Sequence, residues 1–484
     1  MRRAAFFVVF AFVFVFSNII YAETASEKQI KWAAGQASKI HKLELKNTVG
    51  TVILEDMDEL IDVLRKSFRR DYPGRRYEML QKIGEKIGFY VDEIETEDDL
   101  IRNYAQNIAG FYDPLEKAIF VISRELREEI EASIPDERNM SVFSSLDPVW
   151  EDWLRKHQED ITLVHEITHA MQDQNFDLVE WQDQYSSNTD SILAVKTVIE
   201  GLAEITELYM VSNDAEIILR EFLDFYEYLG ENRENERLYD TQDPILDSGQ
   251  DVSYQYKLTY FPYIYGFALI QRQYLKKGWS GTHDLHYDYP MSTEQVIHPE
   301  KFFDKKKLDW PTFIMPPDLY DVLPENYVFQ DSDSMGEYRI YILLKDLIFT
   351  SAEAMQVSEG WDGDRYLAFE NTDTEDISFS WLTIWDTEND AEEFFEFYKN
   401  IIDHKSVSAS VLHSNGTSYL LQTSWDLIFV ERRGDMVLVV EGFNDRDVLD
   451  EIVEKMFEAE VYEAIYDDWE VFPEWYEDEI EEES

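Results

Sequence analysis

The most informative absence in this chain is cysteine, which none of its 484 residues supplies. Disulfide bonds, thiolate metal sites and a lipid anchor on a cysteine after a signal sequence are therefore excluded. Any metal site must use histidine, aspartate and glutamate, a ligand set that suits catalytic zinc better than structural zinc. Stability must come from burial, which an apolar content of 44% and an aromatic content of 15% allow across two or three domains.

Positive charge is also scarce. The chain has 43 lysines and arginines against 101 aspartates and glutamates, and its formal net charge is −58. Such a field repels nucleic acid and anionic lipid surfaces, so both are excluded as partners. The field also opposes folding by self-repulsion that salt screens, and we expect the protein to work in a saline or cation-rich setting.

Long apolar runs are confined to the N-terminus. After Met1-Arg2-Arg3 the chain is apolar from Ala4 to Phe16, a stretch of 13 residues that is short for a membrane span. Small or polar residues follow and end at Ala22. We interpret residues 1–22 as a secretory signal peptide cleaved after Ala22. The mature chain is then expected outside the cytoplasm, secreted or periplasmic, with no stable membrane insertion.

Residues 165–169 read HEITH, and this spacing can build half of a zinc site. On an α-helix His165 and His169 lie on one face, one turn apart, and can bind one metal ion. Glu166 sits beside them within reach of a metal-bound water. The apolar period around the motif predicts a helix over Val149–Phe176 with this segment facing a core. The alternative is a chance match on an ordinary helix.

A tetrahedral zinc with a water ligand needs one more protein ligand. Glu200 is the best candidate, on a helix expected over Asp190–Val211. Glu204, one turn on, could accept a hydrogen bond from a ligand imidazole. Glu204 and Glu207 remain competitors for the ligand position, and a solvated acidic face is the alternative for all three. Gly201 is small enough to let this helix pack closely on the HExxH helix.

The expected chemistry is hydrolysis. Zinc lowers the pKa of its bound water and polarises a carbonyl, while Glu166 takes the water proton and passes it to the leaving amine. The oxyanion needs a further donor. We favour His298, although a helix-terminal histidine bonded to backbone explains it equally well. The other candidates are tyrosines at positions Tyr112, Tyr263 and Tyr265.

Several other polar residues receive weaker interpretations. Asp173, one turn after His169, could support a ligand. His283 and His286 fall in a segment, Gly278–Pro290, that we expect to be a surface loop. The group Trp361, Asp364 and Arg365 is expected to form a structural turn with an ion pair.

The HExxH motif followed by Glu200-Gly201-x-Ala203 resembles the gluzincin branch of the zincin metallopeptidases. The resemblance implies a glutamate as third ligand in an E-x-x-x-D helix, but Glu204 stands where the aspartate would be. Further segments resemble a group of largely uncharacterised exported prokaryotic proteins. These are His165–Leu178, Gly110–Pro114, Ser292–Phe302 and Gly360–Tyr366.

A zincin-like fold would place a twisted sheet over the HExxH helix, with its edge strand antiparallel to a bound peptide. The run Ala118–Ile122, which follows an aspartate-proline turn, is the candidate for that strand. An extended substrate would pair with it by β-augmentation.

The expected fold class is α+β, with two structured domains. After the signal peptide (1–22) we expect a zincin-like metallopeptidase domain (23–325), an α+β accessory domain (330–460) and an acidic tail (461–484). Further helices are expected at Asp214–Leu229, Ala391–Ile401 and Asp447–Phe457. The strands expected in the accessory domain are Glu337–Leu344, Tyr366–Phe369, Ile377–Trp385, Val407–Leu412, Ser418–Thr423, Leu427–Glu431 and Met436–Gly442.

These features together predict an exported zinc-dependent peptidase acting on a peptide or protein substrate. One alternative is a zincin-like binding or scaffold protein without activity. Another is an acidic cation-binding surface protein, although no Asp-x-Asp-x-Asp-Gly loop is present. The sequence leaves the oligomeric state open.

Overall fold

The computed structural model describes residues 27–89, 96–108, 110–133, 148–179, 188–211, 254–347, 350–406 and 408–463. The expected signal peptide, the helix at Asp214–Leu229 and nearly all of the acidic tail lie outside these ranges. The chain divides into two compact units, and the α+β class is confirmed. Unit 1 comprises Met1–Pro299 with Lys345–Ala354, and unit 2 comprises Glu300–Leu344 with Met355–Ser484. The division after Pro299 falls earlier in the chain than residue 325, at which the sequence analysis ends the first domain.

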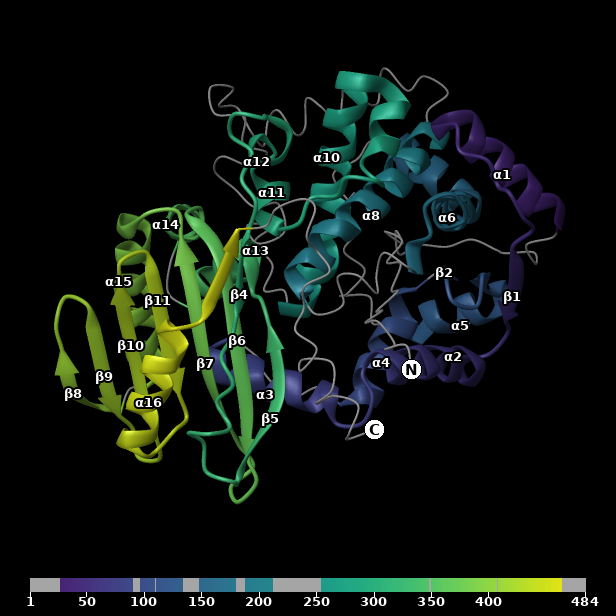
Figure 1. The fold of residues 1–484 in the computed structure, drawn as a ribbon. Coiled ribbons are helices and arrows are strands. Elements are labelled where there is room, and N and C mark those ends of the chain that lie inside the picture. The colour runs from purple at the N-terminus through teal and green to yellow at the C-terminus, as the bar shows by residue number, and fades with distance from the viewer. Residues whose placement is uncertain are drawn as a thin grey trace. The chain divides into compact units, whose positions relative to one another are not determined.

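Unit 1 is mainly helical (Figure 1). Its helices are α1 (Glu27–His41), α2 (Met57–Asp71), α3 (Arg76–Ile87), α4 (Glu97–Asn107), α5 (Arg124–Ser133), α6 (Pro148–Phe176), α8 (Thr189–Val211), α10 (Tyr254–Asp284) and α11 (Thr293–Ile297). Several begin at polar caps that accept the first free backbone N–H groups. Asp56 caps α2, Thr96 forms a capping box with Asp99 at α4, and Ser292 caps α11.

The sheet of unit 1 has the strand order β1-β3-β2. Strand β3 (Ala118–Ile122) pairs in parallel with β1 (Gly50–Leu54) and antiparallel with β2 (Gly110–Asp113). The expectation that Ala118–Ile122 forms an edge strand is therefore wrong. The hairpin accounts for one neighbour of β3, but the other comes from a distant part of the chain, and local pattern cannot reveal it. Among the described strands, β1 and β2 form the edges of this sheet.

Helices α6, α8 and α10 pack side by side (Figure 1). A Cβ on Gly201 of α8 would lie 2.2 Å from the carbonyl oxygen of Gly266 in α10, and a Cβ on Gly266 would lie 2.2 Å from that of Thr197. Both positions therefore require glycine. Helix α8 packs on the HExxH helix α6 as expected, but Gly201 does not make that contact: it permits the close packing of α8 on α10. Another side of α8 packs on α6.

Unit 2 is built on an antiparallel sheet with strand order β5-β6-β7-β11-β10-β9-β8. Its strands are β5 (Tyr327–Asp333), β6 (Trp361–Asn371), β7 (Asp376–Trp385), β8 (Ser410–Ser414), β9 (Ser418–Gln422), β10 (Leu427–Arg433) and β11 (Met436–Glu441). Strands β4 (Thr312–Met315) and β12 (Glu460–Glu463) form a separate pair. The helices are α12 (Glu300–Phe303), α13 (Gly336–Leu347), α14 (Ser351–Ser358), α15 (Glu388–Lys405) and α16 (Arg446–Phe457). The last residues of α13 and the first residues of α14 belong to unit 1, because Lys345–Ala354 is part of that unit.

The strand expected at Glu337–Leu344 is instead helix α13. A distant carboxylate starts this helix, because Asp364 accepts hydrogen bonds from the backbone N–H groups of Met335 at 2.8 Å and Gly336 at 2.9 Å. Asp364 also accepts from the indole groups of Trp361 and Trp381. It lies within strand β6, so the expected turn is wrong as well, and its role is structural.

No helix in the described part of the chain combines the length and apolar character that crossing a bilayer requires. The 29-residue helix α6 is buried from Ile161 to Asp173 because this part packs inside unit 1.

Candidate metal centre

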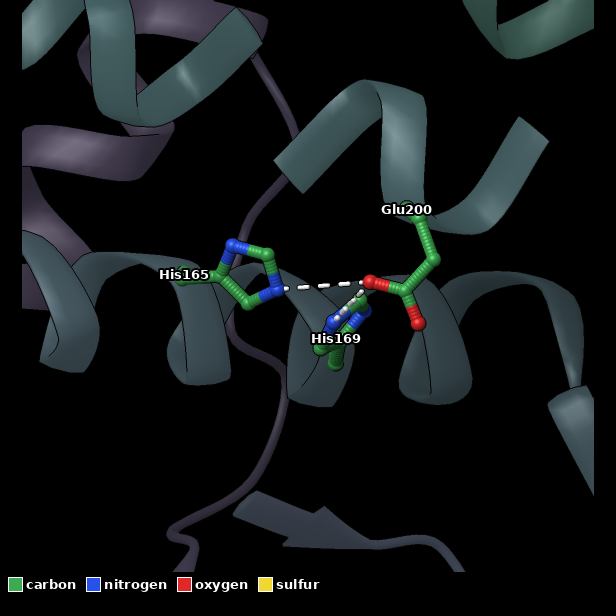
Figure 2. Close-up of side chains that lie close together, drawn as sticks. All are labelled: His165, His169 and Glu200. Atoms are coloured by element: carbon green, nitrogen blue, oxygen red, sulfur yellow. Dashed lines mark ion pairs between the residues drawn. The ribbon is translucent and has the colours of Figure 1, made fainter. Parts of the chain in front are cut away.

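Helix α6 presents the two histidines of the HExxH motif from one face (Figure 2). His165 is fully buried and His169 is 5% exposed. Their rings meet edge to face with centroids 4.6 Å apart. This is the arrangement that the four-residue spacing predicts, because residues four apart stand above one another on a helix.

Helix α8 supplies a carboxylate that points between the two rings (Figure 2). The Oε2 atom of Glu200 lies 3.4 Å from Nε2 of His165 and 3.3 Å from Nε2 of His169. Burial raises the pKa of Glu200, but the neighbouring His169 and His165 outweigh burial and hold it at about 2. The carboxylate is therefore ionised where a cation would bind.

The three facing atoms fit a metal ion. Nε2 of His165, Nε2 of His169 and Oε2 of Glu200 are each buried and make no geometrically sound hydrogen bond. Unsatisfied buried polar atoms are rare in folded proteins, and here they converge on one point. The three residues form a group whose potential ligand atoms lie within 4.8 Å of one another. Two imidazoles and a carboxylate match a catalytic zinc ligand set.

A second carboxylate contacts the far side of His165. Oε1 of Glu207 lies 2.7 Å from Nδ1 of His165, with the glutamate side chain 10% exposed. A proton on Nδ1 is favoured there, which leaves Nε2 free to bind metal. Sequence reasoning gives this role to Glu204. The structure gives the close contact to Glu207, two turns after Glu200. Burial, and next the charge of Glu207, raises the pKa of Glu204.

His169 is oriented through an amide that sequence reasoning misses. Oε1 of Gln172 lies 3.0 Å from Nδ1 of His169, and its Nε2 donates to the carbonyl of Ile199 at 3.0 Å. The same Nε2 lies 3.0 Å from Nε2 of His286. The amide oxygen therefore faces His169, so Nδ1 carries the proton and Nε2 points to the metal position. The i,i+3 spacing of Gln172 from His169 is the signal that could have identified it.

His286 is not on a surface loop as expected. It is 3% exposed, its Nδ1 lies 3.2 Å from the carbonyl of Thr282, and Phe176 stacks on its ring at 4.3 Å. Because Nδ1 donates to that carbonyl, Nε2 is free to accept from Gln172. The segment also begins as helix, since α10 continues to Asp284 after a kink at Gly278. His286 thus holds the amide that orients His169.

Glu166 is buried, and only one of its two carboxylate oxygens makes a hydrogen bond. Its Oε2 accepts a hydrogen bond from the backbone N–H of Tyr112 in β2 at 2.7 Å, while its Oε1 has no partner. Burial raises the pKa of Glu166 against the opposing effect of His165 and His169. A carboxylate with one oxygen fixed, one oxygen free and a raised pKa is suited to accept a proton.

Asp173 does not contact a ligand histidine in the way the sequence suggests. Its carboxylate accepts from the hydroxyl of Tyr112 at 2.6 Å and pairs with Nζ of Lys117 at 2.8 Å. These contacts tie the β2–β3 hairpin to α6, one turn beyond the motif. Asp173 therefore positions the Tyr112 N–H that contacts Glu166.

Among the candidate oxyanion donors, Tyr263 lies beside the ligand group. Its ring stacks on His165 with centroids 6.4 Å apart. Burial raises the pKa of Tyr263, and so do the charges of Glu200, Glu204 and Glu166. Its hydroxyl therefore keeps its proton and can donate. His298 is the C-cap residue of α11, and its backbone N–H donates to the carbonyl of Glu294. It therefore lies at a helix end, which is where the alternative to an oxyanion donor places it.

A histidine cluster near the site makes stability sensitive to acid. Burial, with smaller effects of His283 and His286, lowers the pKa of His41 to about 3, and burial lowers the pKa of His286 to about 3. In the unfolded chain a histidine titrates near 6.5. The unfolded state therefore binds more protons between these values, so stability is full above pH 6.5 and falls towards pH 3.

We expect each of the two groups to cost about 1.4 kcal/mol per pH unit across that window. His41→Gln removes one of them and should flatten the dependence by about that amount, measured by urea unfolding between pH 7 and about pH 4. His404 is an exposed histidine of α15, and His404→Gln is the matched control. Equal slopes for His41→Gln and the wild type would contradict the prediction.

Comparison with known families identifies one match. A family model described as a Domain of unknown function (DUF8575) matches residues 325–453. No curated protein matches the chain. The matched segment runs from the start of β5 into α16, so the chain is similar to this family across the seven-stranded sheet of unit 2, and the candidate metal centre lies outside the match.

Proposed function

We propose that the chain is a zinc-dependent peptidase in which His165, His169 and Glu200 hold the metal. The observation that supports this most directly is the convergence of three buried, unsatisfied ligand atoms beside a buried glutamate. The ligand set is better suited to zinc than to calcium, which prefers six to eight oxygen ligands. Bound zinc would lower the pKa of water and polarise the scissile carbonyl.

In the proposed mechanism the chain moves one proton. As a water attacks the carbonyl carbon, Oε1 of Glu166 accepts its proton and then delivers it to the leaving nitrogen. The Tyr112 N–H holds the other oxygen of Glu166, so Oε1 is left without a partner and can accept the proton. Tyr263 is our preferred donor to the developing oxyanion, in place of His298, because its ring stacks beside His165 and its buried hydroxyl keeps its proton.

The strand topology changes where an extended substrate would lie. Strand β3 has neighbours on both sides, whereas β2 is an edge strand whose Tyr112 contacts the general base. We therefore propose β2 as the strand along which a peptide would align, by β-augmentation. Because the Tyr112 N–H is bonded to Glu166, that group would not be available to the substrate.

The proposal is tested by metal content and hydrolysis together. The mature chain from residue 23 should bind about one zinc and hydrolyse an unfolded protein such as casein. A chelator should abolish the hydrolysis, and added zinc should restore it. Cleavage that continues after complete metal removal would exclude the mechanism. Bound zinc without any hydrolysis would favour the non-catalytic scaffold.

A further inference from the structure

The longest uncharged stretch of the chain is at the end of the unit 2 sheet. Residues 406–425 contain no aspartate, glutamate, lysine or arginine, although the whole chain carries 101 acidic residues. The stretch includes β8, β9 and the turn that leads into β10. Uncharged stretches in acidic proteins are expected inside the core, where charge is costly. This one is largely at the surface.

Strand β8 is exposed along its whole length. All five residues of Ser410–Ser414 are exposed, including Val411 at 56% and Leu412 at 57%. Trp425, in the β9–β10 turn, is 86% exposed. It lies at the Ser410 end of β8, because Ser410 pairs with Gln422 just before that turn. Large apolar side chains therefore gather on an edge that has no charge.

Within the described part of the chain the edge itself is open. There, strand β8 ends the seven-stranded sheet and pairs with β9 alone (Figure 1). Helices α15 and α16 pack on β7, β10 and β11, nearer the middle of the sheet. A strand of this kind presents unpaired backbone groups, and proteins usually protect such edges with lysine, proline or inward-pointing charge. A bulge at Leu412 is the one protective feature that β8 shows.

The opposite edge of the same sheet is different. Strand β5 carries Asp331 and Asp333, both buried. Asp331 accepts from the hydroxyl of Tyr366, and Asp333 pairs with Arg339 at 3.6 Å. Inward-pointing charge of this kind is one of the devices by which proteins protect an edge strand against strand addition. The absence of charge is therefore a property of the β8 edge and not of the sheet.

We propose that β8 is a self-association surface, on which the β8 strand of a second copy pairs in antiparallel orientation. Centred on Leu412, this pairing places Ser410 opposite Ser414 of the second copy and brings no carboxylates together. Each copy has a formal charge of −58, so two copies repel one another, and the uncharged edge is where they approach at least cost. Trp425 of each copy would cover the Ser414 end of the other strand.

Salt dependence follows from the same charges. The Debye length falls from about 10 Å at 0.1 M salt to about 3 Å at 1 M. Screening removes repulsion between the acidic surfaces but leaves apolar contacts and backbone hydrogen bonds intact. A dimer formed through β8 therefore strengthens as salt is added, whereas a dimer held by ion pairs weakens.

The test is the molar mass of the intact mature chain by sedimentation equilibrium in about 1 M NaCl, up to about 200 µM protein, well above a micromolar Kd. We expect a dimer for the wild type and at least a tenfold larger Kd for Val411→Lys, because each ammonium group would face His413 of the other copy and lie diagonally across from the second ammonium group. Leu308→Lys adds the same charge at a 42% exposed position outside the sheet and should leave the dimer unchanged.

A second variant shows whether a loss of dimer in Val411→Lys is caused by misfolding of the strand. Trp425→Ser lies in a turn outside the strand ladder, and it should also weaken the dimer while preserving the melting temperature. A monomeric wild type in 1 M NaCl at the highest concentration would overturn the proposal. So would a dimer that both variants retain, or one that Leu308→Lys disrupts equally. Hydrolytic activity is not part of the readout, so the result is independent of the proposed peptidase function.

Discussion

Replacing Glu166 by glutamine should reduce peptide hydrolysis by about 10²- to 10⁴-fold while leaving the zinc content unchanged. The amide has the shape of the carboxylate and its oxygen can still accept from the Tyr112 N–H, but it cannot take a proton from water. Glu166 is outside the group of proposed ligands, so the metal should be retained. The measurement is kcat/KM on one peptide, together with metal analysis of the same preparation.

The control for this variant is Glu85→Gln, which makes the same chemical change at an exposed position of α3. It should hydrolyse the peptide at the wild-type rate. Loss of zinc from Glu166→Gln would mean that Glu166 is a ligand and not the base. Wild-type turnover with zinc retained would remove Glu166 from the mechanism.

Replacing Glu200 by alanine should weaken zinc binding by more than about 100-fold. Loss of a group that only supports a ligand typically costs 10- to 100-fold in affinity, and loss of the ligand itself should cost more. The Glu200 carboxylate is the anionic member of the set and lies within 3.4 Å of both ring nitrogens. Competition with a chelating dye gives the Kd, and circular dichroism shows whether the variant folds.

Variants of two other glutamates on α8 should rank below Glu200→Ala in their effect on zinc affinity. Glu207→Gln should weaken zinc binding by about 10- to 100-fold, because Glu207 contacts Nδ1 of His165 and not the metal position. Glu204→Gln, between the two, should change the affinity least. If Glu200→Ala binds zinc as tightly as Glu204→Gln does, the proposed ligand set is incorrect.

The elements that carry the site follow closely from local sequence. The helices expected at Val149–Phe176 and Asp190–Val211 are observed at Pro148–Phe176 and Thr189–Val211. Both have an apolar repeat with a period near 3.6, and this repeat depends on residues within a few turns of one another. The helices expected at Ala391–Ile401 and Asp447–Phe457 are found within α15 and α16 for the same reason.

Elements whose neighbours are distant in sequence were less predictable. The run Glu337–Leu344 forms a helix whose start is capped by Asp364. The residues of the run do not indicate that contact, so the helix could not be predicted from them. Strand β3 lies between two strands because β1, from far earlier in the chain, pairs with it in parallel. Short apolar runs are compatible with either structure, so tertiary contacts decide between them.

The same division holds within the candidate site. The placement of His165, Glu166 and His169 along one helix depends only on helix geometry, so the sequence by itself determined it. Which carboxylate would reach them was decided by tertiary packing. Gly201 and Gly266 allow α8 to lie close against α10, and α8 then turns Glu200 towards one nitrogen of His165 and Glu207 towards the other. Local spacing fixes positions along a helix, but the direction from which a second helix arrives depends on contacts across the whole unit.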